Sequence, residues 1–525
     1  MNQNESNAEY QKVVELFEDW RVFEEPVKTN DAPDYSPAAR DAQFAKLGAY
    51  RDRADAIDIE ALTRSERVDL EMIRCEMNGY EYYHRFFKPW QRDPGFYQLV
   101  RYGGNDIPGW HVAHLHNVLI PAWLEYPLDS EAYAKLAQQL SGIPHLVAQA
   151  KENLVGDHKD LYAIAQSGHE WSIEELVKLA DTLKEHHPEL VEKADACVVA
   201  AKDLLAWTKK RHDEMGDCGS GIGIEAFNWS MKNHHRVPYD WHMQEELLQR
   251  ELDRAWATMV LEEHRNRNVE PLAAPQTPKE AARRKVSGEA ELIRVLREMG
   301  VTELADWMSE AWSVTPELQP ITPLEDYSFF HHVDLRGWLA LRPHQVHFFD
   351  LYKEKINTHP IRKHTPLYQT WLFRCEGFAT AFEELLMRAG LEDGTPRTRE
   401  LVHICAAFRA ARALAVHRVH GKGWTLQQAF DFAVKYTPKR WIKRDEGLLY
   451  ADLTTYLRQP EYGVSYNVGK VQVDRLLATR AEQLGDTFNL GEFFNAYFAC
   501  GLIPASLIRW EMTGEEDELK QMGAL

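Results

Sequence analysis

The sequence predicts a large all-α protein, and three observations support that prediction. Apolar residues recur with helical spacing through most of the chain, most clearly in residues 378–389. No segment has the strict alternation of apolar and polar residues that indicates a half-buried strand, and no internal repeat is present. With 525 residues, of which 44% are hydrophobic, the chain is long enough to bury an extensive helical core.

The expected elements follow in order along the chain. Segments with a helical apolar period lie at residues 8–25, 36–56, 129–156, 171–215, 241–266, 281–299 and 302–312. Thr63 with Glu66 is a capping-box pattern that opens a further long helix. The glycine-rich stretch 218–224 lacks the Gly-Lys-Ser/Thr ending of a phosphate-binding loop, and we interpret it as a turn into a helix. The Pro-containing linker near residue 270 separates an N-terminal helical lobe, 1–270, from a C-terminal helical lobe, 271–525, within one continuous structural unit.

The C-terminal lobe contains the clearest amphipathic helix of the chain. It is expected to start near Phe378, with Glu376 just ahead of it or in its first turn, and to stop at Gly390. The next helix also keeps one apolar face and is expected to end at Gly421. Residues 425–428 then form a second capping box, which opens another helix.

Composition limits the partners and the compartment that we expect. The formal net charge of −20 argues against nucleic acid and anionic membranes as partners, because both require a Lys/Arg-rich surface. No run of 18 or more apolar residues indicates a membrane span, and residues 1–12 lack a signal-peptide pattern. The six cysteines include no Cys-x-x-Cys pair. We therefore expect a cytoplasmic protein with reduced thiols and a small-molecule or peptide-like substrate, whose oligomeric state stays open.

Residues with side chains that can bind a metal are concentrated in the segment 330–390. This segment contains His331, His332, Asp334, His344, His347, Asp350, His359, His364 and Glu376. His344 and His347 stand at i, i+3 with Asp350 three residues further, so a helix would place all three on one face. Together with Glu376, these side chains supply three or four ligands of the borderline type that zinc, manganese or iron accept.

Motifs through most of residues 60–510 resemble those of one bacterial family. The segment 375–385 is similar to an EGWALYxExL segment. Further matching residues are Arg67, Asp69, Trp90, Arg92, Asp93, Pro94, Tyr97, Arg409, Ala410, Ala411, Arg412, His420, Gly423, Trp424, Pro460, Tyr466, Gly469, Leu484, Gly485, Asp486, Phe488, Leu490, Phe493, Gly501 and Pro504. On these residues the chain resembles the bacterial "domain of unknown function 885" family, which itself resembles the helical zinc carboxypeptidases of the Taq type. The resemblance implies a two-lobed, zincin-like helical fold of the carboxypeptidase Taq or neurolysin type, with a central cleft.

The resemblance also implies a metal site, whose HExxPGHH segment is not intact in this chain. In the family, a HExxPGHH segment and the Glu of EGWA look like the sources of the zinc ligands, and the Glu after the first His looks like the base that activates water. The counterpart here is the segment 343–350, in which Gln345 follows His344. A glutamine amide has no useful basicity. We therefore expect one divalent metal, zinc above all, at the candidate ligands His344, His347, Asp350 and Glu376, with the water-activating base lost or moved to another residue.

Candidate catalytic residues lie on both sides of the segment 343–350. Tyr466 matches a family residue and offers a neutral phenol as donor to a developing oxyanion; the alternative is a core tyrosine. His420 also matches a family residue, and the alternative is a favourable cation at the end of a helix. His331 and His332 are candidates for acid–base work. Residues that can replace the missing base are Asp334, His331, His332, Glu383 and Glu384.

Three functions stay open on the sequence. The first is a metal-dependent hydrolase that acts on a peptide or a related amide. The second is a hydrolase or lyase that uses His and Tyr side chains for acid–base chemistry without a metal. The third is a non-catalytic ligand-binding protein, in which the histidines of segment 330–390 are hydrogen-bonded core residues. A second histidine group, His111, His114 and His116, is interpreted in that structural sense.

Overall fold

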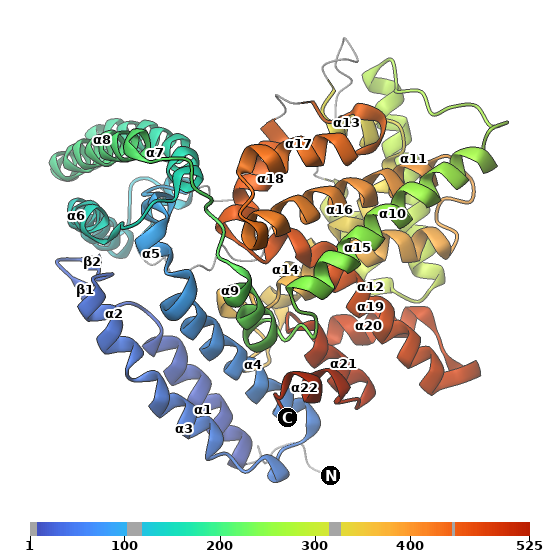
Figure 1. Ribbon diagram of the computed structural model, residues 1–525, viewed down its shortest axis with the longest axis horizontal. Coiled ribbons are helices and arrows are strands. Elements are labelled where there is room, and N and C mark those ends of the chain that lie inside the picture. The colour runs from blue at the N-terminus through green and yellow to red at the C-terminus, as the bar shows by residue number, and fades with distance from the viewer. Residues whose placement is uncertain (1–7, 102–117, 314–326, 444–446) are drawn as a thin grey trace. The chain divides into compact units, whose positions relative to one another are not determined.

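The computed structural model describes residues 8–101, 118–313, 327–443 and 447–525 (Figure 1). The predicted all-α class is confirmed, because the described chain is predominantly helical. The one sheet among these residues is a short antiparallel ribbon of β1 (Lys28–Thr29) and β2 (Ala32–Pro33). None of the described helices is both long and apolar enough to cross a membrane. The histidine group His111, His114 and His116 lies outside the described residues.

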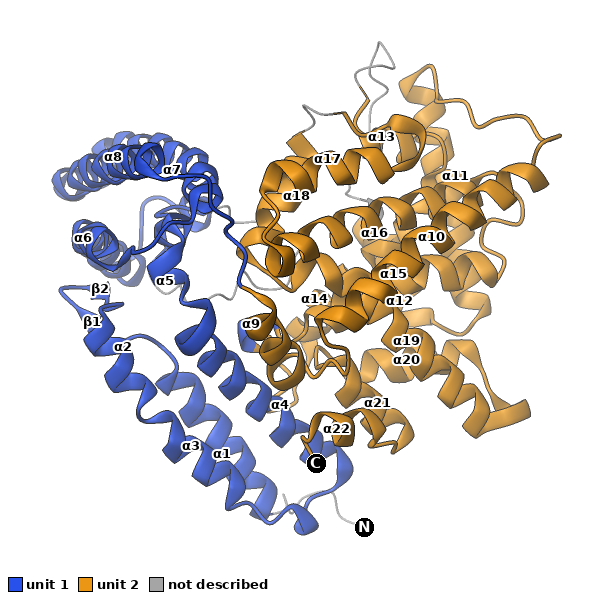
Figure 2. Ribbon diagram, in the orientation of Figure 1, with its two compact units in different colours: residues 1–222, 367–369 blue, residues 223–366, 370–525 orange. Residues whose placement is uncertain are grey.

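The chain divides into two compact units, which Figure 2 shows in different colours. Unit 1 comprises residues 1–222 and 367–369, and unit 2 comprises residues 223–366 and 370–525. The linker near residue 270, where the sequence analysis placed a lobe boundary, lies within unit 2. The helix before that linker, α10 (Trp241–Arg265), packs along α16 (Thr398–Lys422), and this contact accounts for its place in unit 2.

The helices described in unit 1 are α1 (Ala8–Phe23), α2 (Pro37–Phe44), α3 (Leu47–Asp55), α4 (Arg64–Tyr82), α5 (Pro89–Arg92), α6 (Ser130–Asn153), α7 (Lys159–His186) and α8 (Val191–Glu214). Three of them, α2, α4 and α6, begin after a residue whose side chain caps the helix. The capping box predicted at the start of α4 is confirmed, because Thr63 and Glu66 each accept a hydrogen bond from the backbone amide of the other. In the core of this unit, Trp20 is fully buried and packs edge-on against Tyr80. All the candidate ligands and catalytic residues lie in unit 2.

Unit 2 contains the helices that position the candidate site. They are α9 (Ile224–Trp229), α10, α11 (Pro278–Glu298), α12 (Thr302–Ser313), α13 (Phe329–Asp334), α14 (Val346–Ile356), α15 (Leu372–Arg388), α16, α17 (Leu426–Tyr436), α18 (Gly447–Arg458), α19 (Tyr462–Leu484), α20 (Leu490–Ala499), α21 (Ala505–Thr513) and α22 (Asp517–Met522). Helix α16 contacts α10, α17 and α19 (Figure 1) and is buried along almost its whole length. Its polar side chains, including Arg409 and Arg412, must therefore find partners inside the protein.

Two glycines determine how closely α15 and α19 approach each other. A Cβ atom at Gly377 of α15 would collide with the backbone of Gly469 on α19, and a Cβ atom at Gly469 would collide with the backbone of α15. Only glycine leaves room for such contact between two backbones. The contact keeps Glu376 on α15 within hydrogen-bonding distance of Tyr462, the first residue of α19.

Helix α15 is longer at its start than the sequence analysis expected. The expected start was near Phe378, whereas the helix begins at Leu372, so Glu376 lies inside it rather than ahead of it or in its first turn. The added turn forms because its side chains, such as Phe373, are fully buried and extend the packed surface of the helix. The stop expected at Gly390 is confirmed: the helix ends two residues earlier, and Gly390 adopts a φ of +104°.

Helix α16 ends two residues later than expected. Gly421, the predicted stop, lies inside the helix, where a side chain would collide with the indole of Trp241. The left-handed residue that ends the helix is Gly423, with a φ of +66°. The following capping box is confirmed, because Thr425 and Gln428 accept hydrogen bonds from each other's backbone amides at the start of α17.

Candidate metal centre

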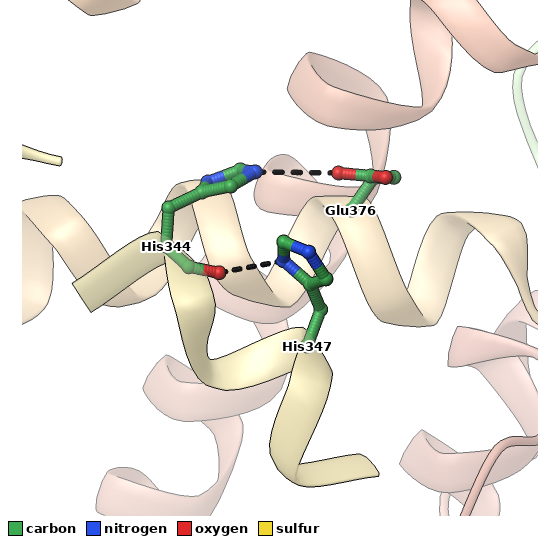
Figure 3. Close-up of side chains that lie close together, drawn as sticks. All are labelled: His344, His347 and Glu376. Atoms are coloured by element: carbon green, nitrogen blue, oxygen red, sulfur yellow. Dashed lines mark hydrogen bonds and ion pairs between the residues drawn. The ribbon is translucent and has the colours of Figure 1, made fainter. Parts of the chain in front are cut away.

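Three of the four predicted ligands converge in unit 2 (Figure 3). His344 lies in the 3-10 turn Arg342–Gln345, His347 lies in the first turn of α14, and Glu376 lies in α15. One ligand-type atom of each side chain stands within 4.8 Å of those of the other two. His344 Nε2 is 3.3 Å from Glu376 Oε2. The 3-10 turn runs directly into α14, and this continuity places the two histidines on the same side.

The other ring nitrogen of His344 faces a buried ion pair. His344 Nδ1 is 2.9 Å from Glu383 Oε1. Arg409 donates two hydrogen bonds to the Glu383 carboxylate, each 2.6 Å long, one to each oxygen. His344 therefore lies between the carboxylates of Glu376 and Glu383, with one ring nitrogen directed at each.

The orientation of His347 is set by the backbone. Its Nδ1 is 2.7 Å from the carbonyl oxygen of His344 (Figure 3). A carbonyl oxygen can only accept a hydrogen bond, so Nδ1 carries the proton and the lone pair of the neutral ring is on Nε2. This is the tautomer in which Nε2 is available to a metal.

Glu376 is held in its ionised form. Its Oε1 accepts a hydrogen bond of 2.5 Å from the hydroxyl of Tyr462, and its side chain is buried. Burial raises the pKa of Glu376, but the hydrogen bond from His344 and the charges of His347 and His344 outweigh burial and lower the pKa to about 2. The carboxylate is therefore anionic at neutral pH and suited to a divalent cation.

His344 gains affinity for a proton when no metal is bound. Burial and the charge of Arg409 lower the pKa of His344, and the hydrogen bonds to Glu376 and Glu383 outweigh them, so its pKa is raised above the usual value. A proton and a metal ion would therefore compete for the same nitrogen, Nε2.

Two tyrosines at the start of α19 complete the surroundings. The ring of Tyr466 stacks at 6.0 Å from the ring of His344, and its centroid is 5.7 Å from that of Tyr462. Burial is the largest cause that raises the pKa of both phenols far above neutrality. Both hydroxyls are therefore neutral donors. The guanidinium of Arg412 lies 4.9 Å from the centre of the Tyr466 ring.

The structure does not bring Asp350, the fourth predicted ligand, into this cluster. Asp350 forms a buried ion pair with Arg374. His344 lies in the 3-10 turn and not in α14, so the common helical face that the spacing suggested for all three residues does not form. The donor set is therefore two histidines and one glutamate.

The three predicted catalytic histidines also lie outside the cluster. His420, on α16, is buried and donates from Nε2 to the backbone oxygen of Tyr456 at 3.0 Å. His331, on α13, has its Nδ1 2.6 Å from the hydroxyl of Ser328. The ring of His332 stacks on Trp441, and burial, with the charge of Arg336, lowers its pKa to about 4. All three histidines thus have structural partners.

The carboxylates considered as replacement bases are held by arginines. Asp334 pairs with Arg342, and Glu384 pairs with Arg254. Glu383 is likewise held by Arg409, but it also reaches the cluster, where it contacts the side of His344 that faces away from Glu376. Two features were not predicted from the sequence: Tyr462 as a site residue, and Arg409 as the partner of Glu383. The signal for Tyr462 is its position one helical turn before Tyr466.

Two solved structures have a fold similar to that of this chain. The chain matches "The structure of a putative lipoprotein of unknown function from Shewanella oneidensis." with a TM-score of 0.66 and 15% identity, covering 96% of this chain and 99% of that one. It matches "The crystal structure of the putative lipoprotein from Colwellia psychrerythraea" with a TM-score of 0.63 and 14% identity, covering 99% and 100%. At these identities the likeness shows the fold alone. No curated protein matches the chain.

These two descriptions contradict one expectation from the sequence. The apparent lack of a signal peptide and the cysteine content led us to expect a cytoplasmic protein. Both structures of similar fold are described as putative lipoproteins, and this description contradicts the cytoplasmic expectation. Cysteine count and terminal composition report on a compartment only indirectly, which is why they misled.

The family resemblance is confirmed for the part of the chain that holds the cluster, whereas the relation to Taq-type carboxypeptidases stays a prediction. Residues 344–512 match the family described as "Bacterial protein of unknown function (DUF885)".

Proposed function

We propose that His344, His347 and Glu376 bind one zinc ion and that the protein is a metal-dependent hydrolase of a peptide or a related amide. The observation that carries this proposal is the convergence of two histidines and an ionised glutamate, with their ligand-type atoms within 4.8 Å of one another. Two histidines and a glutamate are a donor set that catalytic zinc sites use, with a fourth position open to water or substrate.

The spacing of the three side chains fits zinc after a small inward movement. Two ligands at about 2.1 Å from a tetrahedral zinc ion stand about 3.4 Å apart. The 3.3 Å separation of His344 Nε2 and Glu376 Oε2 agrees with that value. The largest separation, up to 4.8 Å, requires closure of roughly 1.4 Å to reach the tetrahedral value.

Each ligand is already oriented by a neighbour on its far side. Glu383 faces Nδ1 of His344, the His344 carbonyl accepts from Nδ1 of His347, and the Tyr462 hydroxyl donates to Glu376. Such partners fix the tautomers of histidine ligands and hold the carboxylate in place in metal sites. When bound, zinc would polarise the scissile carbonyl and supply a nucleophilic hydroxide at neutral pH.

The chain's own residues would bind and orient the substrate around this position. The phenol of Tyr466 is a neutral donor beside His344 and would donate to the oxygen that gains negative charge. Gln345 stands where the family has a glutamate base, and its amide cannot accept the proton of the attacking water. We therefore expect amide hydrolysis by this chain to be slower than by a relative with the glutamate. The two-lobed, zincin-like arrangement with a central cleft belongs to the same proposal.

The test is the metal content of the protein purified without chelators or added metal. We expect about one zinc per chain by elemental analysis, and uptake of one zinc by protein stripped with a chelator. His344→Ala and His347→Ala should each abolish binding. His331→Ala, which removes a histidine outside the cluster, is the matched control and should bind as the wild type does. Failure of the stripped wild-type chain to bind zinc would refute the proposal.

One observation favours a second candidate, a hydrolase or lyase without a metal. His344 has a raised pKa and lies between two carboxylates, so it is suited to hold and deliver a proton. This alternative predicts turnover that survives complete chelation, together with a protein that takes up no zinc. Loss of turnover on chelation, restored by zinc, would exclude it.

A further inference from the structure

We infer that Glu383 and Arg409 act together as positioning residues that hold His344 in its metal-binding tautomer. The inference rests on the proposed metal site and assigns a role within it. Glu383 was considered above as a replacement base, and the geometry points to a different role. Its Oε1 is 2.9 Å from Nδ1 of His344, on the ring edge opposite the nitrogen that faces Glu376. A residue in that position acts through His344.

Arg409 keeps the Glu383 carboxylate a pure acceptor. Its two Nη atoms each donate to one Glu383 oxygen at 2.6 Å, and both side chains are buried, with 5% and 2% exposed. A carboxylate whose two oxygens both accept from a guanidinium is a hydrogen-bond acceptor and not a donor. Nδ1 of His344 must therefore be the donor in its contact with Glu383. The lone pair of the neutral ring is then on Nε2, which points at Glu376.

A competing contact makes the choice of tautomer depend on Glu383. Arg409 Nη2 lies 3.4 Å from Nδ1 of His344, and a guanidinium can only donate. Without Glu383, that contact would favour a lone pair on Nδ1 and a proton on Nε2, the tautomer that cannot offer Nε2 to a metal. With Glu383 present, the shorter contact to an anionic acceptor prevails.

The two histidines differ in what holds them, and this difference offers an internal comparison. His347 donates to a backbone carbonyl, which no substitution removes. His344 depends on the side chains of Glu383 and Arg409. A buried ion pair is in general a weak source of stability, and here it has a role in orienting a ligand.

The neighbouring Glu384 provides a matched control. Glu384 is also buried on α15, and it accepts two hydrogen bonds from Arg254, of 2.7 and 2.9 Å. Within the described residues, no contact joins Glu384 to His344. Glu384→Gln therefore reproduces the structural disturbance of Glu383→Gln, next to it in the sequence and with the same change of charge, without touching the site.

The experiment measures zinc affinity by competition with a chromophoric chelator and records the absorption spectrum of the cobalt-substituted protein. Glu383→Gln should weaken zinc binding by roughly 10–100-fold and change the cobalt spectrum, because His344 loses its anionic acceptor. Glu384→Gln should leave both unchanged. The double variant Glu383→Leu with Arg409→Met removes the pair without leaving an unpaired buried charge. It should weaken zinc binding to the same extent, which keeps the test decisive if Glu383→Gln folds poorly.

The outcomes separate this inference from the proposed function. A wild-type chain that binds no zinc refutes the metal site, and the inference falls with it. A wild-type chain that binds zinc, with Glu383→Gln and the double variant unchanged in affinity and cobalt spectrum, overturns the inference alone. Equal losses in the Glu383 and Glu384 variants would show that the effect is a general disturbance of α15, and would also overturn it.

Discussion

Replacement of Glu376 by glutamine tests the cluster through stability and metal binding at once. The pKa of Glu376 is lowered from 4.5 to about 2, which corresponds to about 3 kcal/mol of folding free energy at neutral pH. Because the pKa in the folded protein is below that in the unfolded chain, this stability is present above pH 4.5 and is lost as the pH falls toward 2. Glu376→Gln removes the anion and should lower the free energy of unfolding of the metal-free protein by up to about 3 kcal/mol.

The assay is urea unfolding of the chelator-stripped protein at several pH values, followed by zinc titration at neutral pH. The glutamine variant should lose the part of the acid dependence below pH 4.5 that belongs to Glu376, and its zinc affinity should fall sharply because the anionic oxygen is gone. Glu376→Asp is the matched control: it keeps the charge, should keep most of the acid dependence, and should bind zinc weakly because its oxygen is withdrawn. A glutamine variant with wild-type stability and wild-type zinc affinity would refute the reasoning.

Three further predictions test the residues around the cluster. Tyr466→Phe should lower kcat by roughly 10²–10³-fold with zinc affinity unchanged, since a phenyl ring cannot donate to the oxyanion; an unchanged kcat would count against that role. Gln345→Glu restores a base and should raise kcat by roughly 10²-fold, measured on a pool of short peptides by mass spectrometry; no increase would show that position 345 does not serve the reaction. Gly377→Ala should cost roughly 1–3 kcal/mol of stability and weaken zinc binding, because its Cβ would force α15 away from α19. Gly394→Ala is the control and should change neither stability nor zinc binding, since an added Cβ there meets nothing within 4 Å. Equal effects of the two substitutions would disprove the contact between α15 and α19.

The parts of the fold that depend on local sequence were predictable. The capping boxes at Thr63 and Thr425 formed as expected, because they depend on residues three positions apart. The pairing of His344 and His347 in space also follows from short spacing. Bringing Glu376 to them required the family resemblance, because 29 positions separate it from His347 and no local pattern links the two.

The polar contacts inside the long helices were not predictable from spacing. In both α15 and α16 the apolar residues recur with a helical period, which predicted one buried face for each helix. In the structure, both helices are buried on nearly every side. The positions that would face solvent in an amphipathic helix therefore hold buried polar residues, among them Glu383 and Arg409. Their pairing joins residues 26 apart in sequence through the packing of two helices. The same reason explains Asp350, which is paired with Arg374 by the packing of α14 on α15.

The most direct test of the central claim is a crystal structure of the zinc-loaded protein with anomalous diffraction measured at the zinc absorption edge. We expect one peak at about 2.0–2.2 Å from Nε2 of His344, Nε2 of His347 and an oxygen of Glu376, with Nδ1 of His344 still in contact with Glu383. A zinc-saturated crystal with no peak at this position, or with His344 still paired to Glu376 and zinc bound by other residues, would contradict it.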